Sequence, residues 1–210
     1  MTVKMINTQP VDEFHRLNHR LMPSGTPFEY AQGSVIVPEE CSEPRTYVFL
    51  EGAIALERQN NPLLLGVVAS PGIVGLGVGA MPTQEQYHLH VEIACRGYHL
   101  PASTTLQLLE KHQLWRDAFY WMTWQHRALE ARDRQLIGTS SYAQIRATLL
   151  TMAKWDDALR ARIGVMAYIQ RRTLISRSVI AEVLAALRQG DYIRMEKGKL
   201  VCINRLPLDY

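Results

Sequence analysis

The feature that most restricts the fold of this chain is a long helical stretch, because the residues from Thr105 to Ile137 include no glycine and no proline. Side chains at intervals of three and four residues form a seam like that of a heptad repeat, which predicts one helix. At 1.5 Å per residue this helix is about 50 Å long. We expect its seam to pack against a second copy, although a helix lying only on its own domain stays an alternative. The seam consists of Leu108, Trp115, Phe119, Met122, His126, Leu129 and Leu136.

The residues before this helix alternate between short β-rich segments and turn residues. An amphipathic helix is expected at residues 14–22, and turns are expected at Glu51-Gly52 and Arg96-Gly97. Many short strands with regular turns predict a sandwich or barrel-like roll of about a hundred residues. The expected strands are residues 34–37, 46–50, 53–57, 63–69, 87–94 and 98–100.

One apolar stretch, from Leu63 to Met81, is nearly free of charge and about long enough to cross a bilayer. It contains five glycines and Pro71, which make a poor helix, so we expect a buried strand and a glycine-rich turn. No membrane contact is predicted. The first ten residues also lack the apolar run of a signal peptide.

The cysteines point to a reducing compartment. There are three, Cys41, Cys95 and Cys202, and they lie far apart in the sequence. This number and spacing disfavour a disulfide framework, a structural zinc site and a cluster with four cysteine ligands. We therefore expect a cytoplasmic protein with no metal and no cofactor.

The residues after Gly138 follow a different pattern, in which short helices precede a small hairpin. Ser140 or Ser141 is a suitable N-cap for the first of these helices, and Gly190 is a suitable C-cap for the last. A β-hairpin is expected around Lys197-Gly198. Helix, short turn, helix with a polar start and hairpin follow in the order typical of a winged helix-turn-helix. The expected helices are residues 141–154, 156–162, 164–172 and 176–189.

Charge is distributed unevenly along the chain. Residues 139–210 hold 12 Lys and Arg against 6 Asp and Glu, whereas residues 1–138 hold 11 against 14. A basic C-terminal third on an acidic body is the pattern expected of a nucleic-acid-binding module. A solvated basic face without a ligand is the alternative.

The second helix of the helix-turn-helix carries the residues that suit DNA recognition. The first residues of such a helix reach base edges in the major groove, and arginine pairs with guanine there. We expect Ser176, Arg177 and Ser178 to contact bases. Basic residues around them are expected to contact phosphates, which positions the protein without reading sequence. The predicted phosphate contacts are Arg171, Arg172, Arg188, Lys197 and Lys199.

The segment from Arg172 to Ile193, preceded by a roll and a long helix, resembles the cyclic-AMP receptor protein/FNR family of bacterial regulators. The resemblance covers essentially the whole chain, and Ser176-Arg177 matches that family's Ser-Arg at the start of the recognition helix. Residues 113–119 and 203–207 are similar to a branch of the family linked to peroxide resistance. The resemblance implies a transcriptional regulator that binds double-stranded DNA, with a link to oxidative stress.

The implied fold is α+β and has three parts. A β-roll like a cyclic-nucleotide-binding jelly roll spans residues 1–104, a long dimerisation helix spans 105–138, and a winged helix-turn-helix spans 139–210. Two-fold symmetry of a homodimer predicts a near-palindromic operator with half-sites about one helical turn, ~34 Å, apart. The family resemblance also implies a contact with RNA polymerase and allows for a small-molecule effector, which the sequence does not identify.

The chain departs from the nucleotide-binding members of that family at one position. Gly75 matches their Gly-Glu-Leu turn, but Leu76 stands where the ribose-binding Glu is expected. No Lys or Arg occurs between Arg58 and Arg96 to neutralise a buried phosphate. We therefore predict that cyclic AMP and cyclic GMP are not ligands. A phosphate nest formed by Gly75, Gly77 and Gly79 is a weaker alternative.

Three other hypotheses follow from single features. The branch resemblance suggests redox sensing by Cys41 or Cys95. The second hypothesis is a regulator or adaptor whose roll binds a small molecule and whose DNA contacts are secondary. The third is a cupin-type metal enzyme using His88, His90 and Glu92, but residues four apart on a strand are about 13 Å apart, too far to share one metal. We therefore expect no metal site and no catalytic activity.

Overall fold

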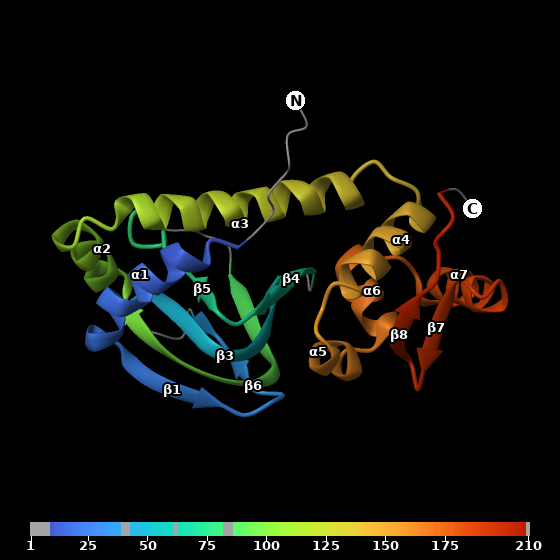
Figure 1. The fold of residues 1–210 in the computed structure, drawn as a ribbon, viewed down its shortest axis with the longest axis horizontal. Coiled ribbons are helices and arrows are strands. Elements are labelled where there is room, and N and C mark those ends of the chain that lie inside the picture. The colour runs from blue at the N-terminus through green and yellow to red at the C-terminus, as the bar shows by residue number, and fades with distance from the viewer. Residues whose placement is uncertain (1–8, 39–42, 61–62, 82–85, 209–210) are drawn as a thin grey trace. The chain divides into compact units, whose positions relative to one another are not determined.

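The computed structural model describes residues 9–38, 43–60, 63–81 and 86–208. The chain forms two compact units, one made of residues 1–60 and 67–131 and the other of residues 61–66 and 132–210. Figure 1 shows a sheet accompanied by helices in the first unit, and short helices with a small hairpin in the second. The boundary between these units, after Ala131, falls inside a helix and coincides with neither predicted boundary. The division into a β-roll, a dimerisation helix and a winged helix-turn-helix therefore stays a prediction.

The first unit is built around an antiparallel sheet (Figure 1). Among the described residues the strands have the order β1-β6-β3-β4, with β2 paired to β6 and β5 paired to β3. The elements are α1 (Val11–Leu21), η1 (Met22–Ser24), β1 (Thr26–Tyr30), β2 (Val35–Ile36), β3 (Arg45–Arg58), β4 (Leu64–Ala69), β5 (Gly72–Val74) and β6 (Tyr87–Pro101).

The turns expected at Glu51-Gly52 and Arg96-Gly97 are wrong, because β3 and β6 each run through them as one strand. The pairing of these two strands shifts register between Phe49 and Ile54, which indicates β-bulges. Bulges bend a strand without ending its pairing, so the chain curves into a roll in which β3 and β6 are longer than the strands expected there. Gly97 faces the carbonyl oxygen of Val48 so closely that no side chain fits.

Two apolar clusters stabilise the first unit. The strands enclose an aromatic-rich cluster that includes Phe28, Tyr47 and Phe49. The helices cover a second cluster, in which the fully buried Trp121 packs with residues of α1 and the sheet. The predicted N-terminal helix is confirmed as α1, and its buried residues are Phe14, Leu17 and Leu21.

The long helix is not continuous, which corrects the prediction of a single helix over residues 105–138. It consists of α2 (Ala102–Lys111) and α3 (Trp115–Leu136), and Gln113 between them has a φ of 54°. The turn allows Leu109 at the end of α2 and Leu114 before α3 to be buried in the same cluster. Among the described residues, no helix is both long and apolar enough to cross a membrane.

The second unit contains four short helices and a hairpin within its described residues. Ser140, Asp156 and Ser176 cap three of these helices, because each side chain accepts a hydrogen bond from a backbone N–H in the first turn. The elements are α4 (Ser141–Met152), α5 (Asp157–Arg162), α6 (Val165–Thr173), α7 (Arg177–Gln189), β7 (Ile193–Glu196) and β8 (Lys199–Ile203).

The end of α7 has a Schellman geometry. The N–H of Tyr192 donates to the carbonyl of Leu187, and the N–H of Asp191 donates to that of Arg188. Gly190 follows the helix as expected, but its φ is −79°, and Asp191 with a φ of 55° adopts the left-handed conformation. Gly190 is therefore confirmed as the C-cap of α7, and Asp191 is the left-handed residue that follows it.

We predict that Gly97→Ala destabilises the protein strongly. A Cβ at this position would lie 1.9 Å from the Val48 carbonyl oxygen, and overpacking of this kind lowers the free energy of unfolding by about 1–3 kcal/mol or more. Gly66→Ala is the control, because an added Cβ there meets no atom within 4 Å. Urea unfolding measures both variants, and equal stabilities would contradict the close approach of β3 and β6.

Candidate nucleic-acid interface

The turn between α6 and α7 is short and has an unusual residue at its centre. Leu174 adopts a φ of 60°, and its N–H closes the end of α6 by donating to the Gln170 carbonyl. A non-glycine residue in the left-handed region costs about 1–2 kcal/mol. The Leu174 side chain is 56% exposed, so burial of this side chain offsets little of that cost. The turn therefore imposes strain on the backbone to set the direction of α7.

The N-terminus of α7 is fixed by Ser176. Its hydroxyl accepts a hydrogen bond from the Val179 N–H at 3.4 Å and lies 3.1 Å from the Ser178 hydroxyl. Arg177, between these two serines, is exposed. The cap therefore orders the first turn, and the guanidinium of Arg177 projects from a defined backbone.

The two faces of α7 differ sharply. One face holds the helix to its unit through Ile180, Val183, Leu184 and Leu187, all buried. The exposed side carries Ser178 and, one turn later, Glu182. Ser178 and Glu182 are four residues apart and therefore share a face of the helix.

One predicted phosphate contact is wrong. Arg172 is only 6% exposed, and its Nη2 donates to the Gln135 Oε1 at 3.2 Å. Burial raises the pKa of the nearby Tyr168 hydroxyl, and the Arg172 charge partly offsets this effect by favouring the ionised form. A buried guanidinium does not reach a DNA phosphate, so Arg172 joins the end of α3 to α6 instead. The neighbouring Arg171 is half-buried.

The hairpin of β7 and β8 confirms the predicted wing. Lys197 and Gly198 at its tip have φ angles of 47° and 78°, as a two-residue type I′ turn requires. The Lys197 side chain is exposed at this tip. Lys199 is only half-exposed, and its ammonium donates a hydrogen bond to the Arg162 carbonyl at the end of α5. Lys197 is therefore better placed than Lys199 to contact a phosphate.

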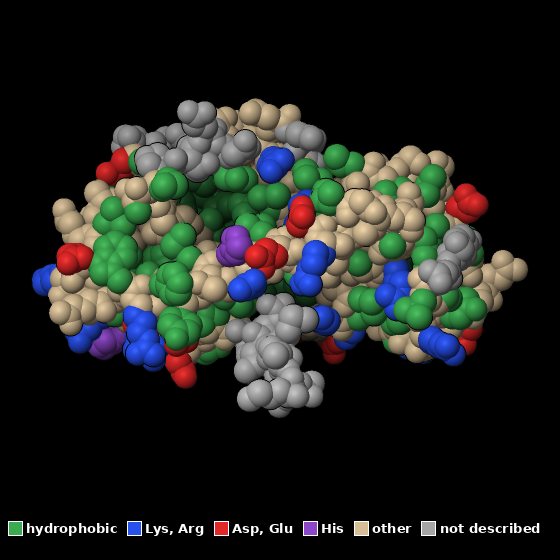
Figure 2. Space-filling view, turned by 90° about the horizontal axis from the view of Figure 1, so that it is seen from above, with side chains coloured by type: hydrophobic (Ala, Val, Ile, Leu, Met, Phe, Trp, Pro, Cys, Tyr) green, Lys and Arg blue, Asp and Glu red, His purple; other side chains and the backbone are tan. Residues whose placement is uncertain are grey.

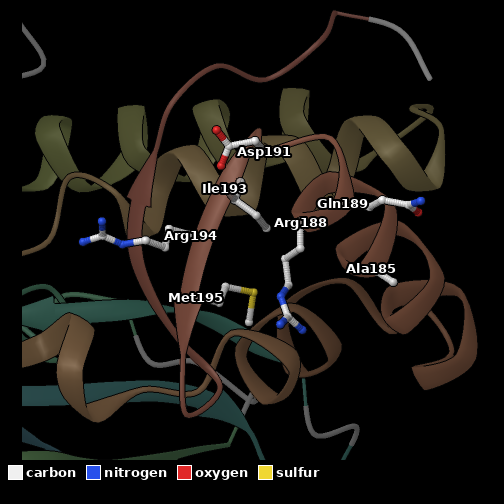
Figure 3. A pocket seen from close by; sticks show the side chains of 7 residues that line it. All are labelled: Ala185, Arg188, Gln189, Asp191, Ile193, Arg194 and Met195. Carbon is white, nitrogen blue, oxygen red and sulfur yellow. The ribbon is translucent and has the colours of Figure 1, made fainter.

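A shallow hollow lies between the end of α7 and β7 (Figure 3). Its volume is about 470 Å³, and its lining includes Arg188, Asp191 and Arg194. In Figure 3 the guanidinium of Arg188 points toward Met195, away from the carboxylate of Asp191. Arg188 was predicted as a phosphate contact and is exposed. Arg194, which the sequence analysis did not single out, lies 3.8 Å from the Glu196 carboxylate.

The predicted seam is largely solvent-exposed in this single chain. Trp115, Phe119, Met122 and Leu129 are 45%, 69%, 46% and 52% exposed, and they follow one another along α3 at intervals of four, three and seven residues. Figure 2, which looks onto the side of the molecule that faces upward in Figure 1, shows hydrophobic side chains gathered on the surface of the first unit. We call Trp115, Phe119, Met122, His126 and Leu129 the outer stripe of α3. His126 lies 3.6 Å from Glu130.

Two residues do not belong to this seam. Leu108 lies on α2 and packs against the helix-covered core, and Leu136 is buried. The prediction of a single helix included both residues in the seam because it assumed that the apolar spacing continues without a break from Leu108 onward. The break at Gln113 changes the face on which Leu108 lies.

The opposite face of α3 packs onto the sheet unit. Trp121 is fully buried, and the Gln125 Nε2 donates to the Ile73 carbonyl at 2.9 Å. Asp117 is buried and pairs with Arg16 of α1 at 2.8 Å. The inner face is therefore packed within the chain, whereas the apolar side chains of the outer stripe are exposed.

The glycine-rich turn after β5 packs tightly against its surroundings. Leu76, which replaces the expected ribose-binding Glu, is buried in the helix-covered core. Backbone N–H groups of Val78, Ala80 and Met81 donate to carbonyls within the turn. These three donors are engaged within the turn, and the phosphate nest of Gly75, Gly77 and Gly79 stays a prediction. The absence of cyclic-nucleotide binding stays a prediction.

The cysteine and histidine hypotheses find little support. Cys95 is buried, and burial raises the pKa of its thiol, which disfavours the reactive thiolate. Cys41 lies outside the described residues. His90 lies 3.1 Å from the Glu57 carboxylate, which places its imidazole in a cross-strand pair. Among the described residues no group of three or more potential ligands is arranged for a metal.

Comparisons with known proteins decide the family. Residues 141–208 match a family described as winged helix-turn-helix DNA binding. The inhibitor of hydrogen peroxide resistance of Escherichia coli strain K12 is 55% identical over 203 residues, which cover 96% of this chain and 98% of that protein. The protein of the same name from Salmonella typhimurium is 52% identical over 205 residues, covering 97% and 98%. The chain belongs to the inhibitor of hydrogen peroxide resistance family.

Solved structures show the fold of this family member. A global regulator of Xanthomonas campestris, described as responsive to c-di-GMP, has a TM-score of 0.70 at 16% identity and covers 90% of this chain and 99% of its own. A transcriptional regulator of the CRP/FNR family from Eubacterium rectale has a TM-score of 0.69 at 10% identity, with 90% of each chain covered. The predicted α+β fold with a C-terminal winged helix-turn-helix is confirmed.

The left-handed conformation of Leu174, in the turn between α6 and α7, can be tested by substitution. Leu174→Gly should raise the free energy of unfolding relative to Leu174→Ala by about 1 kcal/mol, because glycine adopts the left-handed region without steric cost. Both variants remove the same exposed side chain, so their difference isolates the backbone term. Thermal and urea unfolding measure it. A Leu174→Gly variant no more stable than Leu174→Ala would show that the turn is not strained.

Proposed function

We propose that this chain is a homodimeric, sequence-specific DNA-binding regulator of transcription without catalytic activity, acting in the cytoplasm. Each copy presents α7 to the major groove of a near-palindromic operator. The observation that supports this most is the capped N-terminus of α7, which holds Arg177 exposed between Ser176 and Ser178. Arg177 reads guanine there, since its planar group matches the guanine O6 and N7 acceptors.

Phosphate contacts come from the basic residues that surround this helix. Lys197 at the wing tip and Arg188 at the end of α7 are exposed, and Arg171 is partly so. Such contacts hold the protein on the duplex and contribute no sequence preference. Arg172 is excluded from this role by its burial.

The homodimer forms through the outer stripe of α3. Its apolar side chains are exposed in one chain, and the heptad-like spacing allows two such helices to pack side by side. Two-fold pairing then supplies two recognition helices for the two half-sites of an operator. The alternative is a monomer in which the outer stripe of α3 stays exposed to water. The oligomeric state measured below distinguishes the two.

The regulated process is peroxide resistance. This part of the proposal rests on the printed name of the Escherichia coli and Salmonella relatives, which are more than half identical over nearly the whole chain. Cyclic nucleotides are not part of it, since Leu76 occupies the position of the ribose-binding carboxylate and is buried. The proposal also includes a contact with RNA polymerase and a small-molecule effector that is not a cyclic nucleotide.

Arg177→Ala should reduce the preference for the operator over random duplex by about 1–3 kcal/mol, because it removes a base contact. Lys197→Ala should instead weaken binding to both duplexes to a similar extent, because a phosphate contact is common to all sequences. Fluorescence anisotropy with operator and random duplexes at fixed salt measures both. If Arg177→Ala retained the wild-type ratio of affinities, the assignment of base recognition to Arg177 would be wrong.

Phe119→Glu should convert the dimer to a monomer and weaken operator binding, because two carboxylates would meet in an apolar interface. Arg127→Glu is the matched control, since it places the same side chain at an exposed position of α3 outside the stripe. Sedimentation equilibrium gives the oligomeric state of each. A wild-type protein that is monomeric at micromolar concentration, or a dimer unaffected by Phe119→Glu, would reject this interface.

A further inference from the structure

One residue of the outer stripe of α3 is not apolar. His126 lies between Met122 and Leu129 in the stripe, and its imidazole is exposed in a single chain. In the proposed homodimer this position meets the same position of the second copy, because seam residues of paired helices face one another. A polar side chain in an apolar seam lowers stability unless it has polar partners. The imidazole therefore needs a partner that the apolar residues of the stripe do not supply.

Glu130 is the neighbour of His126 on the same face of α3. The two residues are four apart, and the Nδ1 of His126 lies 3.6 Å from the Oε1 of Glu130. This separation is longer than an ordinary hydrogen bond. It is close to the distance of about 3.3–3.4 Å between two ligands of one tetrahedral zinc ion whose bonds are about 2.0–2.1 Å long. The two atoms are therefore spaced as a pair of metal ligands.

The Glu130 carboxylate is oriented in a way that suits this role. Its Oε2 accepts a hydrogen bond from the Nη1 of Arg127 at 2.8 Å, whereas Oε1 is the oxygen that faces His126. Carboxylates that ligate metals are commonly hydrogen-bonded as well, which fixes their orientation. Each copy therefore offers one nitrogen and one oxygen, which make half of a four-ligand metal site.

We propose that the homodimer binds a divalent transition-metal ion of the zinc class at its two-fold axis, through His126 and Glu130 of both copies. This inference rests on the homodimer of the proposed function and adds a ligand to its interface. Two imidazole nitrogens and two carboxylate oxygens are a donor set that suits tetrahedral Zn²⁺. Within the described residues of a single copy, no group of three or more ligands is found. The expectation of no metal site, which considered one chain alone, is therefore revised for the dimer.

A shared metal couples metal binding to dimerisation. The four ligands come together only when two copies pair, so the ion binds the dimer more tightly than the monomer. By linkage, the ion then shifts the equilibrium towards the dimer. Because the proposed operator contact needs two recognition helices, the metal also strengthens operator binding. DNA recognition then depends on the supply of the metal.

Titration of the full-length protein with Zn²⁺, after removal of bound metals with a chelator, tests this inference. Isothermal titration calorimetry should give one Zn²⁺ per two chains. Sedimentation equilibrium should give a dimer dissociation constant that Zn²⁺ lowers about tenfold or more. Mg²⁺ should have no such effect, because it prefers six oxygen ligands and keeps several waters. Co²⁺ should bind at the same site and show the visible absorption of a tetrahedral complex.

His126→Ala and Glu130→Gln each remove one ligand per chain. Both variants should lose the stoichiometry of one Zn²⁺ per two chains and the effect of Zn²⁺ on the dissociation constant. Both should still dimerise in chelator, because the apolar residues of the outer stripe remain. His19→Ala is the control, since it removes an exposed histidine from α1 and leaves α3 unchanged. It should bind Zn²⁺ and dimerise as wild type does.

The outcomes separate this inference from the homodimer on which it rests. If wild type is dimeric in chelator and Zn²⁺ leaves the dissociation constant unchanged, or if His126→Ala responds to Zn²⁺ as wild type does, the metal site is wrong and the dimer stands. If wild type stays monomeric at micromolar concentration with and without Zn²⁺, the proposed homodimer fails and the metal site with it. Loss of the Zn²⁺ effect in both α3 variants, with wild-type behaviour of His19→Ala, establishes the site.

Discussion

The structure depends on a helix that has two apolar faces and only one neighbouring sheet. The inner face of α3 is committed, since Trp121 is fully buried and Gln125 and Asp117 bond to the Ile73 carbonyl and to Arg16. The outer stripe carries side chains of similar size that remain in water in a single chain. Exposed apolar patches of this kind mark interaction sites, which is why we propose that two copies pair along the outer stripe.

Much of the secondary structure was predictable because it follows local rules. Ser140 and Ser176 are good N-caps, and the apolar spacing of α7 is regular, so those helices were found with nearly correct ends. The break at Gln113 was not predictable in this way. Neither glycine nor proline marks it, and the turn exists because Leu109 and Leu114 are both buried in one core, which is a tertiary effect.

Two other errors have the same origin. Glycines at positions 52 and 97 suggested turns, whereas the structure uses them where strands bulge and pass close to one another. Charge suggested a phosphate contact for Arg172, but a sequence shows the charge of a side chain and not its burial. Arg177 was found correctly as an exposed residue because an N-cap and an amphipathic pattern together fix the face and the end of a helix.

The attachment of the wing has a consequence for the partner. The hairpin is fastened to the start of α6 by a hydrogen bond from the Val165 N–H to the Gly198 carbonyl, and to α5 through Lys199 and the Arg162 carbonyl. In the proposed complex with DNA, we expect a wing held at two points to keep its position when the width of the groove changes. The duplex would then have to adjust, and the ease with which a given sequence bends would add to recognition without any contact to a base.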